Sequence, residues 1–239
     1  MTIPEIVEAI ILDLTKYADP ERKKMMAGNH PTSMETIGLK VPNQRKVIEQ
    51  WRKILAPFTE QEWIQLAIVL VDTTILECQQ VAFEFIWKNK KALQVITPEQ
   101  IFALGKTLDN WVSVDMYCLC ITGYCWRTGI LTDSVIENWA KSENRWIRRT
   151  ALVSTVPLNL RSRGGKGDVE HTLRICKMLV TDYDDMIVKA MSWALRELSK
   201  SDKQAVEEFL DQNYAKLHFR VKREVETKLR TGKKNGLSS

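Results

Sequence analysis

The chain has 239 residues, of which 44% are hydrophobic and 27% charged, and its formal net charge is +5. This length suits one large core or one stacked array, and we expect a single domain over residues 1–230 followed by a C-terminal tail over 231–239. No apolar stretch reaches transmembrane length, and the N-terminus lacks the basic segment of a signal peptide. We therefore expect a cytoplasmic protein, and we expect it to be a monomer.

The five cysteines lie in apolar runs without disulfide spacing, which is typical of a reducing compartment. Cys118, Cys120 and Cys125 lack the spacing of zinc ligands, and the three histidines share no motif. The glycine-rich tract 163–167 has neither the spacing of a phosphate loop nor a preceding strand, so we interpret it as a flexible basic loop. We expect no metal and no cofactor.

Helix start signals recur along the chain. Residues 59–62 (TEQE) have the form of a capping box, and residues 97–100 (TPEQ) add a proline at the first helical position. Further caps are expected at residues 132–133 and 201–202. The apolar residues between these signals recur at helical spacing, and no segment alternates as a strand does. The sequence therefore predicts an all-α fold.

Large apolar pairs are expected near the starts of four helices, and these pairs begin 36, 35 and 40 residues apart: Ile75-Leu76, Trp111-Val112, Trp146-Ile147 and Met186-Ile187. Such a period is typical of two-helix repeats that bury their apolar faces by stacking. We expect a curved α-solenoid of HEAT-like antiparallel helix pairs, with an ordinary helical bundle as the alternative. A polar residue follows three or four places after the start of each pair and is expected to project into one groove: Gln79, Asp115, Arg149 and Lys189.

Positive charge is concentrated in two blocks in the second half of the chain. Residues 141–166 contain seven Lys and Arg against one Glu, and residues 216–234 contain eight against two. One such block is usually a solvated face. Two blocks favour a polyanionic partner.

The best candidate for an active site is the pair Trp111 and Asp115, which share one face if their segment is helical. Trp193 repeats the theme between Lys189 and Arg196. A positive surface with exposed indoles and one carboxylate suits an enzyme that acts on a cationic nucleobase. The alternative is that both indoles pack in the core, as tryptophans at helical spacing usually do. Core packing is the role expected for five other tryptophans: Trp51, Trp63, Trp87, Trp126 and Trp139.

Five segments of the chain form an ordered set: residues 38–45 (GLKVPNQR), 110–115 (NWVSVD), 144–151 (NRWIRRTA), 187–197 (IVKAMSWALRE) and 222–224 (KRE). In this order they resemble segments of the AlkD-type alkylpurine DNA glycosylases of the DNA alkylation repair family. No single segment is diagnostic, but the ordered set covers most of the chain. The resemblance implies a HEAT-like repeat fold and a monofunctional DNA glycosylase of base excision repair. The implied substrate is double-stranded DNA containing cationic N3- or N7-alkylated purines, so we expect association with the nucleoid.

The resemblance also implies roles for individual residues. Asp115 corresponds to the catalytic carboxylate, and Trp111 and Trp193 to the two indoles that face the damaged nucleotide. Arg149, Arg45 and Arg196 correspond to residues that contact the DNA backbone. Three further cations are candidates for DNA binding: Lys189, Arg148 and Lys40.

The sequence departs from the family pattern at three places. Asn29 stands where many members have a tyrosine, Val41 is apolar where a polar residue is usual, and the tract 161–166 lengthens a connection. These changes bear on how DNA is held near the N-terminus.

Asp115 and the indoles also suit the chemistry of base release on their own. An alkylated purine that carries a positive charge is already a good leaving group. Catalysis therefore has to stabilise the positive charge that develops on the sugar. An anion such as Asp115 stabilises the oxocarbenium character of the transition state more than the ground state, either directly or by orienting a water. Indole faces attract a cationic base. The alternative function is a catalytically silent repeat module that binds damaged or branched DNA or a protein.

Overall fold

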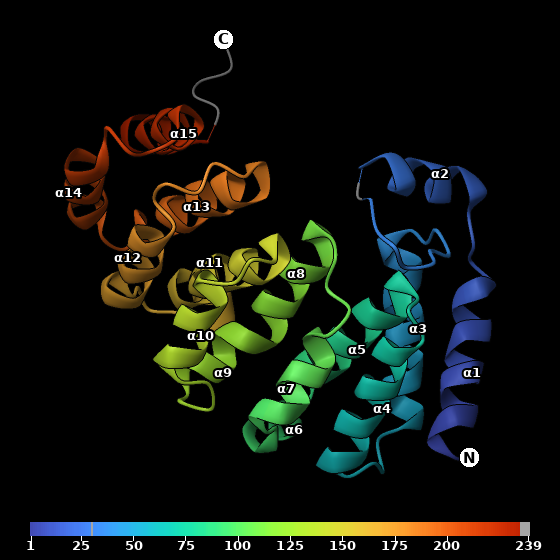
Figure 1. The fold of residues 1–239 in the computed structure, drawn as a ribbon. Coiled ribbons are helices and arrows are strands. Elements are labelled where there is room, and N and C mark those ends of the chain that lie inside the picture. The colour runs from blue at the N-terminus through green and yellow to red at the C-terminus, as the bar shows by residue number, and fades with distance from the viewer. Residues whose placement is uncertain (30, 235–239) are drawn as a thin grey trace. The chain divides into compact units, whose positions relative to one another are not determined.

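The computed structural model describes residues 1–29 and 31–234 (Figure 1). These residues form helices and contain no strand, and one isolated parallel bridge joins Glu35 to Ile75. The predicted all-α class is confirmed. Within the described ranges, no helix has both the length and the apolar character that a membrane span requires.

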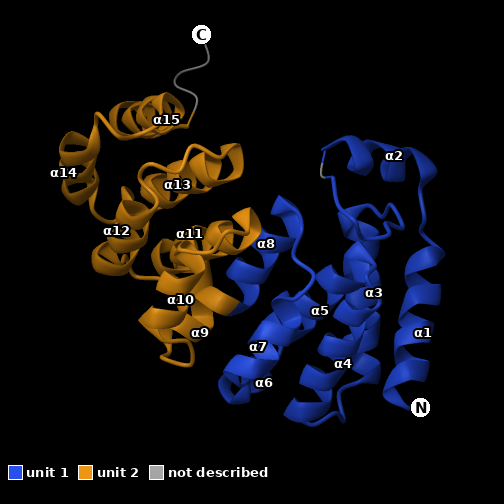
Figure 2. Ribbon diagram, in the orientation of Figure 1, with its two compact units in different colours: residues 1–121 blue, residues 122–239 orange. Residues whose placement is uncertain are grey.

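The chain folds into two compact units, unit 1 over residues 1–121 and unit 2 over residues 122–239 (Figure 2). The division falls inside a π-helix, Cys118–Thr122. A single domain over 1–230 and a solenoid through the whole chain stay predictions.

Unit 1 is built around α4 and α5. The helix α4 packs on α1, α5, α6 and α7, while α5 also packs on α3 and α8. The bounds of the helices in this unit are α1 Ile3–Thr15, α2 Pro20–Asn29, α3 Val41–Ile54, α4 Glu60–Asp72, α5 Leu76–Lys88, α6 Lys90–Val95, α7 Pro98–Gly105 and α8 Trp111–Tyr117. The core is formed by buried side chains that include Ile64, Leu70 and Phe83.

Helix caps in unit 1 follow the sequence closely. Thr59 and Thr97 each accept a backbone N–H three residues later and are reciprocally bonded by the side chain at that position, as the predicted capping boxes require. Each cap satisfies N–H groups that the helix itself leaves without a partner. The predicted starts of α4 and α7 are confirmed.

Unit 2 is built around α11 and α13. Three helices pack in succession, α11 on α13 and α13 on α15, while α10 packs on α11 and α12 on α13. The bounds are α9 Gly123–Arg127, α10 Asp133–Ala140, α11 Arg145–Asn159, a 3-10 turn Arg161–Arg163, α12 Val169–Met178, α13 Asp185–Leu198, α14 Lys203–Asn213 and α15 Phe219–Thr231. The apolar pairs Trp146-Ile147 and Met186-Ile187 lie in the first turns of α11 and α13.

Two features of unit 2 differ from the sequence-based expectation. Thr132 occupies the N-cap of α10 without a capping hydrogen bond, whereas Asp202 caps α14 within the predicted segment 201–202. The basic tract predicted as a flexible loop is a hydrogen-bonded turn. Gly164, with φ of +81°, donates to Arg161, and Arg127 donates to the carbonyl of Arg163.

Candidate functional site

Trp111 begins α8 and is 38% exposed, so it is not a core residue. Ser113, Val114 and Tyr117 form the buried face of the same helix. Asp115 stands one turn after Trp111 and is partly exposed. The indole and the carboxylate therefore lie away from the buried side of α8. The core-packing alternative for Trp111 is wrong.

The last residue of α2, Asn29, approaches the indole of Trp111. The Nε1 of Trp111 donates to the backbone carbonyl of Asn29 at 3.3 Å. Asn29, which replaces the family's tyrosine, thus contacts Trp111 through its main chain, a contact that any side chain at this position permits.

Asp109 and Asn110 fix the start of α8. Asn110 caps the helix by accepting the N–H of Ser113, and the carboxylate of Asp109 accepts hydrogen bonds from the Thr32 hydroxyl and from both the N–H and the hydroxyl of Ser33. Burial raises the pKa of Asp109, but these hydrogen bonds outweigh it and hold the pKa below its ordinary value. The helix that carries Trp111 is therefore anchored to residues 32–33 by an ionised carboxylate.

The start of the motif at residues 38–45 is hydrogen-bonded to the side chain of Glu77, which is 1% exposed. Its carboxylate accepts the backbone N–H groups of Ile37 at 2.9 Å, Gly38 at 2.8 Å and Leu39 at 3.3 Å. Gly38 has φ of +88°, and a Cβ there would lie 2.7 Å from the carbonyl oxygen of Asp19. Glycine is needed at this position for both reasons.

This motif presents its cations to solvent. Lys40 is exposed and forms an ion pair with Asp19 at 3.4 Å, and Arg45 is exposed on the first turns of α3. Val41 is also exposed, and it begins α3. The apolar departure at this position is accommodated at a helix start and not in the core.

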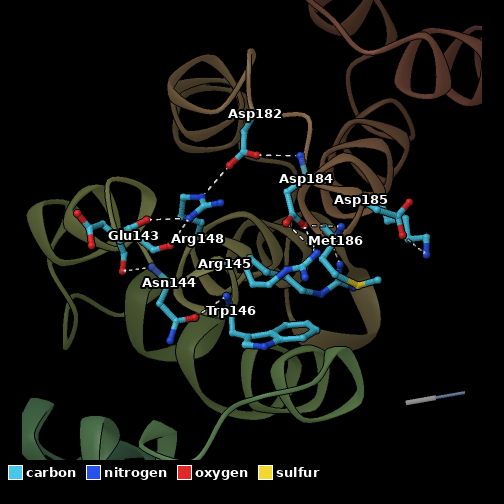
Figure 3. Close-up of polar contacts among 12 residues, drawn as sticks. Glu143, Asn144, Arg145, Trp146, Arg148, Asp182, Asp184, Asp185 and Met186 are labelled. Carbon is cyan, nitrogen blue, oxygen red and sulfur yellow. Dashed lines mark hydrogen bonds and ion pairs between the residues drawn. The ribbon is translucent and has the colours of Figure 1, made fainter. Parts of the chain in front are cut away.

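In unit 2, the arginines at the start of α11 are engaged by groups at the start of α13 (Figure 3). Arg145 pairs with Asp184 at 2.7 Å, and Asp184 also caps α13 by accepting the N–H of Met186. Burial raises the pKa of Asp184, and the bond to Arg145 and the backbone N–H groups more than offset this, so the pKa is lowered.

Arg148 forms a second link to the segment before α13, visible in Figure 3. Its Nε donates to Asp182 at 2.7 Å, and its Nη1 donates to the carbonyls of Ser142 and Glu143. Its contact with DNA stays a prediction, and such a contact has to compete with these internal bonds.

Arg149 is 4% exposed, and its Nη1 donates to the carbonyl of Met186 at 2.5 Å. A buried guanidinium is costly unless its donors are satisfied, so this position has a strict geometric requirement. Its predicted contact with the DNA backbone is untested.

Trp193 and its neighbours lie along α13. Trp193 is partly exposed, and Lys189, one turn earlier, pairs with Asp185 at 2.6 Å. Arg196 donates to the hydroxyl of Ser192. Burial lowers the pKa of Arg196, and the charges of Glu224 and Glu197 act in the opposite direction.

Glu224 ties α15 to α13. Its carboxylate accepts the Ser192 hydroxyl at 2.6 Å and Arg220 Nε at 2.9 Å. Burial raises the pKa of Glu224, but these hydrogen bonds and the charges of Lys234 and Arg220 lower it by more, so the net shift is downward. This contact gives the motif at 222–224 a structural role that the sequence did not reveal.

Burial decides the predictions made for Gln79 and for the five tryptophans expected in the core. Gln79 was expected to project into a groove, but it is fully buried and donates to the hydroxyl of Thr107 at 2.8 Å, so that prediction is wrong. Trp51, Trp63 and Trp126 are buried as expected, whereas Trp87 and Trp139 are partly exposed.

The anchoring roles of Glu77, Asp109 and Asp184 were not predicted from the sequence. A signal was present for two of them: Glu77 is a carboxylate next to an apolar pair, and Asp109 directly precedes the cap residue Asn110. The partners of both carboxylates lie dozens of residues away, so spacing alone could not assign them.

The described residues contain no group of three or more His, Cys, Asp or Glu side chains suited to a metal ion. The five cysteines are free and buried. Burial raises the pKa of Cys78, Cys125 and Cys176 to about 12, which keeps these thiols protonated at neutral pH.

Comparisons with known proteins agree with this description. A search of curated proteins found no significant match. Among solved structures, the predicted DNA alkylation repair enzyme from Enterococcus faecalis is similar to this chain in fold, with a TM-score of 0.71 and 21% sequence identity over 87% of this chain and 95% of that one. The model of the family of DNA alkylation repair enzymes matches residues 10–229. The chain belongs to the DNA alkylation repair enzyme family.

Proposed function

We propose that this protein is a monofunctional DNA glycosylase that hydrolyses the N-glycosidic bond of cationic N3- or N7-alkylated purines in double-stranded DNA. The observation that carries the proposal is the start of α8, where an indole 38% exposed and a partly exposed carboxylate stand one turn apart. Membership of the family supports a role in the repair of alkylated DNA and supports enzymatic activity. The reaction class and the substrate are our inference.

In the proposed reaction, the bond between the anomeric carbon and the purine nitrogen breaks, and its electron pair leaves with the base and neutralises the charge on the purine. A water molecule adds to the anomeric carbon and loses a proton to the solvent. Asp115 stabilises the positive charge that develops on the sugar and orients this water. Because the leaving group is already cationic, no general acid is needed.

The aromatic residues are proposed to select the charged base. A cation over an aromatic face gains roughly 0.5 to 2 kcal/mol, and a neutral purine gains less. Trp111 is proposed to supply one indole face and Trp193 a second. The exposed position of Trp111 supports this role, since a buried indole could not meet a nucleotide.

DNA is proposed to be held through its phosphates. The cations assigned to this task are Arg45, Lys40, Arg149, Arg148, Lys189 and Arg196. Arg45 and Lys40 are exposed, which supports their assignment. Phosphate contacts of this kind carry no sequence information, so binding is expected to be nearly independent of sequence and to weaken with salt.

The direct test is release of free base. Wild-type protein is incubated with a duplex containing one 7-methylguanine, and the matched control is the same duplex with guanine. We expect free 7-methylguanine and an abasic strand that stays uncut until alkali is added. The same assay is repeated with a duplex containing 3-methyladenine. If the protein binds both damaged duplexes but releases neither base, its function is that of a catalytically silent DNA-binding module.

A further inference from the structure

A groove in unit 2 lies between α14 and α15 and contains none of the residues assigned to base excision. Its volume is about 980 Å³, and its lining includes Tyr214, Phe219, Lys222, Arg223 and Arg230. Phe219 is 64% exposed and Tyr214 is 48% exposed. Large exposed aromatic side chains gathered in one groove are typical of a binding site for a ligand or a macromolecule.

Both aromatic rings are accompanied by a cation. The ammonium of Lys222 lies 4.5 Å from the centre of the Tyr214 ring and donates to the backbone carbonyl of the same residue. The guanidinium of Arg223 lies 5.9 Å from the centre of the Phe219 ring. Each of the two rings therefore combines a flat apolar face with a neighbouring positive charge.

The rings are also held in place. Phe219 packs at 4.5 Å from the ring of His218, and His218 lies 5.9 Å from Tyr183, which is 57% exposed. The Tyr183 hydroxyl donates to the carbonyl of Lys216. The charge of Glu226 and a hydrogen bond with it raise the pKa of Tyr214, so this phenol stays protonated. A row of aromatic rings thus extends from Tyr183 through His218 to Phe219.

The two walls of the groove differ in charge. The wall from α15 presents Lys222, Arg223 and Arg230 against Glu226, and residues 216–234 carry eight Lys and Arg against two Glu. The wall from α14 presents Glu207 and Asp211 beside Lys203. A ligand that suits the groove is therefore anionic on the side that meets α15 and offers hydrogen-bond donors on the side that meets α14. Between these two sides it has flat faces that can stack on the aromatic rings.

We propose that this groove binds a single-stranded segment of nucleic acid, with its phosphates against α15 and its bases stacked on Phe219 and Tyr214. Exocyclic amino groups of the bases meet the carboxylates of α14. Aromatic stacking combined with a basic wall is the usual means of binding unpaired strands. An acidic peptide matches α15 equally well but is repelled by Glu207 and Asp211. In a duplex the base faces are covered by neighbouring pairs, so the rings cannot reach them.

The test measures binding of labelled single-stranded oligonucleotides by fluorescence anisotropy. The probes are oligodeoxycytidylate, whose bases carry an exocyclic amino group, oligocytidylate of the same length, which separates DNA from RNA, and an undamaged duplex. We expect Phe219→Ala and Tyr214→Ala each to weaken binding of a single strand by roughly 5- to 100-fold, the range for loss of one stacked base. Binding of the duplex changes by less than about twofold.

Control variants make the result specific. Phe219→Trp keeps an aromatic face and should retain binding, whereas Phe219→Leu keeps the apolar character without that face and should lose it. Tyr17→Ala removes an exposed aromatic residue from unit 1 and should have no effect. Circular dichroism and thermal unfolding establish that each variant is folded.

Excision of 7-methylguanine from a duplex should be unchanged in Phe219→Ala, so this proposal and the glycosylase assignment fail separately. Equal binding of single strands by wild type, Phe219→Ala and Tyr214→Ala would overturn the proposal. So would equal binding by Phe219→Leu and Phe219→Trp, which would indicate an apolar partner such as a peptide.

Discussion

The start of α8 in unit 1 and the starts of α11 and α13 in unit 2 use charged residues in different ways. At α8 the anchoring carboxylate is Asp109, which binds hydroxyl and N–H groups of Thr32 and Ser33. Trp111 and Asp115 on the same helix stay at least partly exposed. The helix start is thus fixed by one set of residues while another set faces outward.

At α11, by contrast, the arginines that the sequence presents as a basic surface also hold unit 2 together. Arg145 and Arg148 are paired with Asp184 and Asp182, and Arg149 is buried against Met186. The difference shows that a run of cations in a sequence is not equivalent to a surface available for DNA. The cations of the first motif, Lys40 and Arg45, are exposed although they stand in a less basic segment.

The comparison predicts its largest effect at Arg149. Replacing this buried residue by Ala removes a charge-assisted hydrogen bond and leaves a cavity, so the free energy of unfolding should fall by about 3 kcal/mol. Arg161→Ala, which changes an exposed arginine of the same unit, should change it by less than about 0.5 kcal/mol. Urea unfolding of both variants checks this. Similar small losses would show that Arg149 has no structural role.

A second prediction concerns the anchor of the first motif. Glu77→Gln keeps the shape of the side chain but turns an NH₂ group toward backbone N–H donors, and we expect a loss of about 2 kcal/mol. Hydrogen exchange should become faster at Ile37, Gly38 and Leu39. The matched control is Glu84→Gln, a partly buried carboxylate on α5 that pairs with Lys88 at 3.8 Å. Unchanged exchange at residues 37–39 would contradict the role assigned to Glu77.

A third prediction follows from the lowered pKa of Asp109. Because the pKa in the folded protein lies below the ordinary value of 3.8, the stabilisation by this carboxylate is fully present above that value and is lost as pH falls through the folded pKa. Asp109→Asn should therefore be less stable than wild type at neutral pH, and the difference should shrink in acid. Unfolding of both proteins across this range measures it. A difference that does not depend on pH would refute the linkage.

The smallest predicted effect separates exposed from engaged cations. Arg45→Ala should reduce the slope of log affinity against log salt by about 0.9, the value for one lost phosphate contact. Arg148→Ala should change the slope less, because its guanidinium is bonded to Asp182 and to two carbonyls, and should instead lower stability. Anisotropy with a duplex over a salt series decides between the two. The reverse order would show that the internal bonds of Arg148 open when DNA binds.

The helical class and many helix starts could be predicted from local signals. The capping boxes at Thr59 and Thr97 depend on residues three positions apart, and the structure contains both. The pairing of Trp111 with Asp115 on one helical face needed only the helical repeat. The hypothesis of an exposed indole at Trp111 is confirmed, although residue type and spacing alone favour burial, because tryptophan at helical spacing is usually buried.

The parts that could not be predicted depend on contacts between distant residues. Glu77 meets residues 37–39, and Glu224 meets Ser192, across separations that no local pattern encodes. Gln79 followed the same spacing rule as Asp115 but is buried beside Thr107. Spacing assigns a residue to a face of a helix, and only packing determines whether that face is open.

The central claim is that Asp115 supplies the negative charge for base release. Asp115→Asn preserves the shape of the side chain and removes the charge, and single-turnover release of 7-methylguanine measures the consequence while anisotropy follows binding of the same duplex. We expect binding to be unchanged or slightly tighter and release to be slower by about 100- to 1000-fold, the cost of removing one group that stabilises charge in a transition state. Release at the wild-type rate by Asp115→Asn would contradict the claim.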